Sequence, residues 1–273
     1  MTRAGVGGPL ALALPVLGGI GALWLMGAPS TFLLVNAVAL LLGLTIIALL
    51  PQLDTLMTRR FVVSALLVLL VLPLLTGPYV NGIARWLPMG PFTLHAGMLA
   101  IPLLAALAAL DEDYSAPILL AGILVAALQR DAASGLALTF AAMGIYNAKR
   151  DWKDGVVAGT GFFATLVMWV RGELPAQPFV ERMLVDVAVV QPLAAFALLA
   201  CLVASFLLIL HALPALMAQR HALAGTLFGF SIAAVLSNYP SALIGYGAAP
   251  ILGFALALSQ VDRAESKAPQ AAE

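Results

Sequence analysis

The chain has very few charged residues for its length. Of its 273 residues, 13 are lysine or arginine and 13 are aspartate or glutamate, so 10% are charged and the formal net charge is zero. A typical soluble domain is about 25% charged and about 45–50% apolar, whereas this chain is 63% hydrophobic with a mean hydropathy of +1.05. One water-soluble fold of this size cannot hide so much apolar surface. The balanced charge also excludes the basic field that nucleic-acid binding requires.

Cysteine and histidine are also scarce. The one cysteine, Cys201, lies inside an apolar run, so the chain has no disulfide framework. No two histidines or carboxylates have metal-ligand spacing on one helix, which argues against a tight metal site built by the protein. No glycine-rich phosphate loop follows a strand, which argues against transport driven by a nucleotide.

Long apolar runs are abundant instead. A helix that crosses a bilayer needs about 20 mostly apolar residues. The sequence therefore predicts an all-α, polytopic membrane helix bundle with about ten transmembrane helices. Because several runs are short and the fifth and sixth could form one interrupted pair, the range is eight to ten spans. We expect residues 1–259 to form a single transmembrane domain. The last fourteen residues, 260–273, hold five of the 26 charges and predict a disordered cytoplasmic tail. The candidate spans are 8–27, 31–50, 61–76, 94–110, 115–128, 132–147, 155–170, 185–210, 222–237 and 241–259.

Basic residues predict the orientation of this bundle, because cytoplasmic loops carry an excess of lysine and arginine. With ten spans and the N-terminus inside, nine basic residues fall on the cytoplasmic side and four on the outer side. Both ends of the chain are therefore expected in the cytoplasm. The outer set is Arg85, Arg130, Arg171 and Arg182, and the inner set is Arg3, Arg59, Arg60, Lys149, Arg150, Lys153, Arg220, Arg263 and Lys267.

The connection between the third and fourth spans is dense in glycine, proline and aromatic residues. A charge at membrane depth costs about 2.5–3.5 kcal/mol on insertion scales, so each one needs a reason. Residues 81–92 of this connection would lie in the membrane interface, with Trp86 at headgroup depth and Arg85 available to a phosphate. His95 follows this connection and would reach the cavity that the connection lines. A plain interfacial anchor is the alternative interpretation.

Two further polar segments interrupt the apolar runs. Arg130 and Asp131 are either a neutralised pair that caps the sixth helix or a charged pair that faces a polar cavity. Asp186, at the start of a long apolar helix, is either a partner of the helix dipole or a general base at the mouth of a cavity.

Residues 238–250 contain prolines, two tyrosines and two glycines within an apolar region. They predict a broken or re-entrant segment, which is tolerated only where protein or water covers the backbone. Close packing of a continuous helix through its small residues is the alternative.

The order of these features resembles the SEDS family of shape, elongation, division and sporulation proteins, the FtsW and RodA type. After the third span, members carry a stretch like N-G-A-x-R-W-(I/L), followed by G-P-x-(S/T)-(I/L)-Q-P-S-E. The chain has Asn81-Gly82-Ile83-Ala84-Arg85-Trp86-Leu87 and then Gly90-Pro91-Phe92-Thr93-Leu94, but His95-Ala96-Gly97-Met98 replaces Q-P-S-E.

Two later motifs extend the resemblance along the chain. The family's Q-P-D-L-G-(T/S) is similar to Gln129-Arg130-Asp131-Ala132-Ala133-Ser134, and the Tyr-Gly core of its C-terminal motif is kept at Tyr246-Gly247. The family's large outer loop before the eighth span is reduced to about fifteen residues here. That loop ends in members in P-E-x-H-T-D-F, whose Asp is the proposed catalytic residue, and Asp186 is the residue to which the resemblance carries this role.

The resemblance implies a glycosyltransferase that polymerises lipid-linked sugar units, of the undecaprenyl-pyrophosphate type, into peptidoglycan at the outer face of the bacterial inner membrane. Members usually work beside a single-span transpeptidase partner. A divalent cation, Mg or Mn, is compatible with the pyrophosphate but is not required by any residue pattern. The expected catalytic residue is Asp186, and the expected substrate-binding residues are Arg85, Trp86, Arg130, Asp131, His95 and Tyr246.

Two other classes of function stay open at this point. A non-catalytic scaffold subunit of a cell-envelope complex would keep the fold without the chemistry. A transporter or flippase of a lipid-linked glycan would also need an amphipathic cavity with buried charge.

Overall fold

The computed structural model describes residues 5–90 and 92–261, and these are mainly helical. The predicted all-α membrane helix bundle is confirmed, with one short antiparallel hairpin, β1–β2, in addition. The predicted tail lies outside the described residues from 262 onward, as do Arg3, Arg263 and Lys267. The elements are α1 (Gly7–Leu25), α2 (Ser30–Leu49), α3 (Leu56–Thr76), β1 (Trp86–Met89), β2 (Phe92–His95), α4 (Ala96–Ala108), α5 (Ser115–Gln129), α6 (Ala132–Lys149), α7 (Trp152–Arg171), α8 (Met183–Val190), α9 (Pro192–Leu207), the π-helical η1 (Leu208–Ala212), α10 (Met217–Leu236) and α11 (Ala248–Ser259).

The eighth and tenth predicted spans are shorter or more divided than the sequence suggests. The run 185–210 is split into α8 and α9 at Pro192, because proline lacks an N–H and is favoured in the first turn of a helix. The run 241–259 is helical only from Ala248 onward. Residues 237–247 are non-helical, and Tyr239 and Ile244 within them are buried, so the predicted break is confirmed.

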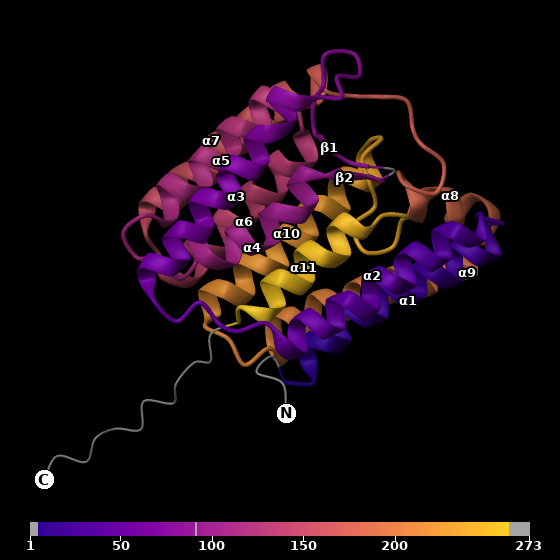
Figure 1. Ribbon diagram of the computed structural model, residues 1–273, viewed down its shortest axis with the longest axis horizontal. Coiled ribbons are helices and arrows are strands. Elements are labelled where there is room, and N and C mark those ends of the chain that lie inside the picture. The colour runs from indigo at the N-terminus through magenta and orange to yellow at the C-terminus, as the bar shows by residue number, and fades with distance from the viewer. Residues whose placement is uncertain (1–4, 91, 262–273) are drawn as a thin grey trace, which may run out of the picture.

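The long helices of the described chain run between two sides of the bundle (Figure 1). We call the side where α1 begins the N-side. There the Gln219 side chain of α10 donates to the Gln260 carbonyl at the end of α11 at 3.1 Å, and Gln52 after α2 donates to the Val261 carbonyl at 2.7 Å. We call the other side, which carries the β1–β2 hairpin and α8, the Arg85 side. The described chain therefore begins and ends on the same side, as an even number of spans requires.

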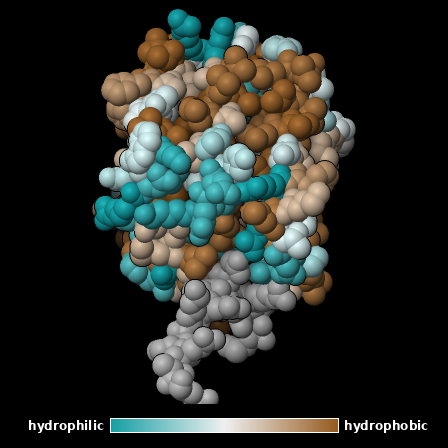
Figure 2. Space-filling view, turned by 90° about the vertical axis from the view of Figure 1, so that its left-hand side faces the viewer, coloured by the Kyte–Doolittle hydropathy of each residue, from teal (hydrophilic) through white to brown (hydrophobic). Residues whose placement is uncertain are grey.

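Apolar side chains cover much of the outside of this bundle. By length and composition, four stretches are sufficient to cross a membrane, namely α1, α2, α3 and the continuous Pro192–Ala212, while α4, α5 and α11 are shorter apolar helices. Leu193 and Val170 are among the large hydrophobic side chains that stay exposed. Figure 2 shows broad hydrophobic areas on one face, beside groups of hydrophilic residues. Such a surface is expected of a protein whose solvent is lipid.

The acidic run at 111–113 lies on the N-side, where the orientation rule leaves it without an explanation. The Arg60 guanidinium of α3 binds the Asp111 carboxylate at 2.7 Å and the Asp113 carboxylate at 3.2 Å. The hydrogen bonds from Arg60 hold the pKa of Asp111 below its usual range. Lys149 at the end of α6 donates to the Asp111 carbonyl. The acidic run thus joins α3 to the α4–α5 connection and to α6.

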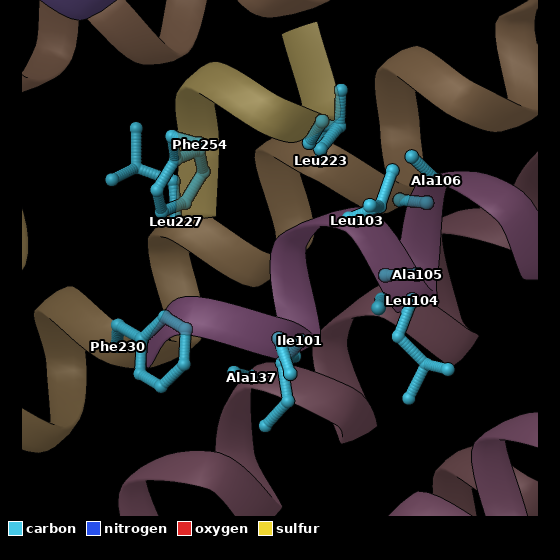
Figure 3. Packing of buried hydrophobic residues seen from close by; sticks show 14 of the residues in the cluster. Ile101, Leu103, Leu104, Ala105, Ala106, Ala137, Leu223, Leu227, Phe230 and Phe254 are labelled. Carbon is cyan, nitrogen blue, oxygen red and sulfur yellow. The ribbon is translucent and has the colours of Figure 1, made fainter. Parts of the chain in front are cut away.

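The core lies where α4, α6, α10 and α11 meet, and α1, α2, α8 and α9 run along its flank (Figure 1). Figure 3 shows Ile101 of α4 beside Ala137 of α6, with Phe230 of α10 nearby, and Phe254 of α11 beside Leu227 of α10. Helices α6 and α10 cross very closely, because a Cβ at Gly225 would clash with the Phe140 carbonyl. Small residues at such crossings let helix backbones approach one another in a membrane.

We predict that Gly225→Ala lowers the free energy of unfolding by about 1–3 kcal/mol, the usual cost of overpacking a well-packed contact. The matched control is Gly159→Ala on α7, where a new Cβ would meet no atom within 4 Å. That control should be neutral or stabilising by up to about 1 kcal/mol, since alanine is the better helix former. Reversible denaturation in mixed micelles measures both values, and equal effects would contradict the close crossing.

Candidate functional site

A hairpin on the Arg85 side brings two of the predicted site residues together. In β1–β2, Trp86 pairs with His95 in antiparallel register, and the Ala96 N–H donates to the Arg85 carbonyl at 3.0 Å. The hairpin therefore ends with Arg85 and His95 adjacent in space at the start of α4. The tight turn that precedes it, closed by a Val80–Ile83 bridge, has Gly82 at positive φ.

Arg85 forms a fully buried ion pair with Asp131. Both side chains are 0% exposed, and Arg85 Nη1 lies 3.7 Å from Asp131 Oδ1. Asp131 is the N-cap of α6, where it accepts from the Ser134 N–H at 3.3 Å and from the Ser134 hydroxyl. The predicted capping role is thus confirmed, but the neighbour that neutralises Asp131 is Arg85 rather than Arg130. Arg130 is exposed and has a left-handed backbone conformation, so the two adjacent side chains do not pair.

His95 is the second group that faces Asp131. Its Nδ1 accepts from the Met98 N–H at 3.3 Å, which caps α4 and leaves the proton of the neutral ring on Nε2. That Nε2 lies 3.5 Å from Asp131 Oδ2. The capping hydrogen bond fixes the orientation of the His95 ring. The Asp131 carboxylate therefore lies close to both an arginine and a histidine from the hairpin segment.

Tyr239, from the non-helical segment 237–247, closes the site. Its ring lies 4.9 Å from the Arg85 guanidinium carbon, and the Trp86 ring lies at the same distance. The Tyr239 hydroxyl accepts from the Ala132 N–H at 3.3 Å and donates to the Gly172 carbonyl at 3.5 Å. The Gly172 carbonyl also accepts from Arg85 Nη2 at 3.4 Å. We call Arg85, His95, Asp131 and Tyr239 the Arg85 cluster.

The Arg85 cluster leaves donors unused. Arg85 Nε and Nη1 and His95 Nε2 are buried and have no hydrogen-bond partner among the described residues. Buried polar groups are normally satisfied by protein or by ordered water. The cluster is therefore a small polar site enclosed in protein, in which Arg85 Nη1 and His95 Nε2 both lie within 4 Å of one carboxylate.

Glu181 is a second buried carboxylate on this side of the bundle. It is 4% exposed, accepts from the Gln177 N–H at 2.9 Å, and forms a backbone bridge with Pro240, the neighbour of Tyr239. Burial raises the pKa of Glu181, and the charge of Arg85 opposes the rise. The family resemblance carries the catalytic role to Asp186 at the end of this loop and gives Glu181 no role, because burial of a loop carboxylate has no sequence signal.

The remaining predicted site residues lie apart from the Arg85 cluster. Asp186 is exposed on the first turn of α8, and among the described residues it forms no ion pair. Tyr246 stacks on Phe32 of α2, with ring centroids 3.8 Å apart. Arg130 lies beside Gly82, since a Cβ there would be 3.4 Å from Arg130 Nη1. The structure thus unites Arg85, Trp86, His95 and Asp131, and leaves Arg130, Asp186 and Tyr246 outside them.

Sequence reasoning also missed Tyr239 as a site residue. Its signal was the Asn238-Tyr239-Pro240 sequence inside the predicted broken segment, where an aromatic residue beside proline must find a protein partner for its hydroxyl. In the described part of the chain, no three His, Cys, Asp or Glu side chains come close enough together to hold a metal ion.

Comparison of the fold with solved structures is informative where sequence comparison is not. Two crystal structures of the rod shape determining protein RodA of Thermus thermophilus match, one of them an aspartate-to-alanine variant. The variant gives a TM-score of 0.69 at 19% identity over 91% of this chain and 93% of that chain. The other gives 0.63 at 20% identity over 91% and 92%.

The chain has the RodA fold. The fold that the SEDS resemblance implied is therefore confirmed. A chain in a structure described as a peptidoglycan synthase complex, which coordinates polymerization and crosslinking, also matches, with a TM-score of 0.57 at 21% identity over 92% of this chain and 95% of that one. No family model matches the sequence, and no curated protein does either. The RodA fold is thus preserved in a sequence that has diverged widely.

We predict that Asp131→Asn lowers the free energy of unfolding by about 3–5 kcal/mol, because it leaves Arg85 buried without a counter-charge. Asparagine still caps a helix, so the loss reports on the charge. The matched control is Asp151→Asn at the N-cap of α7, which is not buried and should cost less than about 1 kcal/mol. Combining Arg85→Met with Asp131→Asn should recover part of the loss in the same unfolding assay. Additive losses would exclude a coupled pair.

The raised pKa of Glu181 predicts a pH-dependent stability. Between the ordinary value of 4.5 and the raised value, the folded protein binds more protons than the unfolded chain, so stability falls as the pH rises through this window. Glu181→Gln removes this titration. Its melting temperature should match that of the wild type below the window and exceed it above. Glu112→Gln, an exposed residue on the N-side, serves as control and should show no such divergence.

Proposed function

We propose that this protein is a SEDS-like membrane glycosyltransferase of the bacterial inner membrane, which polymerises lipid-linked sugar units at the outer face. The observation that carries the proposal is the RodA fold over more than nine-tenths of the chain, with the Arg85-Trp86 motif in a polar cluster on the Arg85 side. The Thermus thermophilus relatives are shape-determining proteins, and another neighbour belongs to a peptidoglycan synthase complex. The proposed substrate class is therefore a peptidoglycan-type, undecaprenyl-pyrophosphate-linked sugar.

The reaction needs one base and a cationic surface. The acceptor hydroxyl oxygen attacks the anomeric carbon of the donor sugar, the bond from that carbon to the pyrophosphate oxygen breaks, and the pyrophosphate-linked lipid leaves with the electron pair. A carboxylate takes the proton from the hydroxyl. Asp186 is the proposed base, since it is exposed at the start of α8 on the side where lipid-linked sugars would lie.

The proposed role of Arg85 changes with its burial. A guanidinium that is 0% exposed and paired with Asp131 cannot also contact a substrate in this state, so Arg85, Asp131 and His95 would position the loop that carries Trp86. Arg130 is exposed beside Gly82 and is the proposed cation for the leaving pyrophosphate. Tyr246 would line the path of the substrate. A Mg or Mn ion, if one bound with the substrate, would supply further positive charge to the leaving pyrophosphate.

The lipid tail also needs an apolar path. A groove of about 420 Å³ runs between α9 and α10, with almost only apolar side chains along it. Leu184 of α8 lines this groove, two residues before Asp186, and Ser241 lines it two residues after Tyr239. A tail in this groove would keep its sugar on the Arg85 side.

A non-catalytic scaffold is the second candidate. The specific observation in its favour is that Arg85 and Asp131 neutralise one another inside protein, with Asp186 outside the cluster. Such an arrangement stabilises a fold without performing chemistry. In that case the partner would be an envelope protein, which the neighbouring peptidoglycan synthase complex supports, and the family resemblance implies a single-span, transpeptidase-like one.

We predict that purified protein forms polymer from a lipid-linked sugar, and that Asp186→Asn lowers its rate by at least about 100-fold, the lower range for loss of a general base. The matched control is Asp113→Asn, an exposed aspartate on the N-side, which should leave the rate unchanged. Product is measured by gel electrophoresis of labelled glycan. An active Asp186→Asn variant would remove Asp186 from its role. A wild type that makes no polymer but retains an envelope partner would favour the scaffold.

A further inference from the structure

The N-side has an open groove that the proposed reaction does not use. It has a volume of about 480 Å³, within the range of about 300–1,000 Å³ usual for ligand pockets. Its walls come from α6, from α10 and from the segment in which α9 passes into η1, represented by Phe206 and Leu210. We call it the N-side groove. It lies at the opposite ends of α6 and α10 from the Arg85 cluster.

Glycines explain why this groove exists. A Cβ at Gly144 of α6 would clash with the His221 carbonyl of α10, and a Cβ at Gly225 would clash with the Phe140 carbonyl. The backbones of the two helices are therefore in direct contact at both positions, and both glycines line the groove. The π-helical η1 ends the third wall at the same level, and π segments occur often at functional sites.

Phenylalanine side chains form an apolar wall of the groove. The rings of Phe140 and Phe228 meet edge to face with centroids 4.8 Å apart, and the ring centroids of Phe206 and Phe228 are 6.2 Å apart. Phe228 and Met143 remain 41% and 49% exposed, although they line a concave surface. A slot of this kind accommodates a flexible hydrocarbon chain.

Polar groups lie at the N-side end of the same groove. His221, Tyr146 and Asn147 are among its lining residues, and none of the lining residues is a carboxylate. His221 Nδ1 donates to the Met217 carbonyl at 2.7 Å, and its Nε2 has no described partner.

Positive charge accompanies these polar groups. Arg220 precedes His221 near the start of α10, and its Nε is buried without a hydrogen-bond partner among the described residues. The start of α10 also carries the positive end of the helix dipole. Lys149 and Arg150 follow the part of α6 that lines the groove. None of these basic residues lines the groove, but Arg220 is the sequence neighbour of the lining residue His221. An apolar groove flanked by basic residues is complementary to one class of ligand, an acyl chain attached to a phosphate.

We propose that the N-side groove binds an anionic phospholipid of the leaflet on that side, with an acyl chain along the Phe140–Phe228 wall and the phosphate at Arg220 and His221. Under the orientation expected from the basic residues, this is the cytoplasmic leaflet, where anionic lipids attract basic segments. The lipid would join α6, η1 and α10 on the N-side. This binding does not require the protein to be an enzyme.

Lipid retention by the purified full-length chain tests the proposal. Protein in detergent is equilibrated with phosphatidylglycerol or phosphatidylcholine, and native mass spectrometry counts the bound lipid. Arg220→Gln should lower retention of phosphatidylglycerol at least threefold and leave phosphatidylcholine unchanged, because it removes a phosphate contact only. Met143→Trp should lower retention of both lipids at least threefold, because it fills the slot.

Matched controls distinguish lipid binding at this groove from effects of the overall charge and hydrophobicity of the bundle. Lys153→Gln removes one exposed positive charge on the same side, outside the groove, and Met57→Trp enlarges an exposed methionine at the start of α3. Both controls should retain both lipids as the wild type does. Equal losses for Arg220→Gln and Lys153→Gln, or full retention by Met143→Trp, would overturn the proposal. Self-association of the chain that Met143→Trp abolishes, with lipid retention unchanged, would instead identify the groove as a contact between copies.

Discussion

The buried pair of Arg85 and Asp131 is the contact on which the architecture of the Arg85 side depends. An arginine cannot give up its charge in a protein, so a fully buried guanidinium requires a counter-charge and several acceptors. Asp131 supplies the charge, the Gly172 carbonyl accepts a hydrogen bond, and two aromatic rings cover the faces. Each of these partners comes from a different segment. The requirement of one side chain therefore fixes the relative positions of the β1–β2 hairpin, α6, the end of α7 and the segment after α10.

This arrangement gives the chain a polar centre that is enclosed in protein. His95 occupies the position of the glutamine in the family motif and serves at once as the cap of α4 and as a neighbour of Asp131. The groups that remain exposed on this side, Arg130 and Asp186, lie around the cluster rather than in it. Any chemistry on a lipid-linked sugar would then take place beside the cluster, with the cluster as its rigid support.

Much of the fold was predictable from the sequence, because lipid imposes a simple rule on helix length and composition. Apolar runs bounded by charge or proline located every helix of the bundle within a few residues, except at Pro192 and in residues 241–247, where backbone chemistry divides an apolar run. The site was only partly predictable. The Arg85-Trp86 motif and the Asp131 cap are local patterns, so the sequence displays them. The partners of Asp131 and the burial of Glu181 depend on contacts between segments more than 35 residues apart along the chain, for which a single sequence has no signal.

The covering of Arg85 by Tyr239 has a consequence for biogenesis. The ribosome makes Arg85 in the first third of the chain and Tyr239 in the last fifth. Until α10 and the following segment have entered the bilayer, the guanidinium lacks one of its two aromatic faces. The charged Arg85 side chain is therefore fully covered only when the C-terminal helices have been inserted, long after Arg85 itself has entered the membrane.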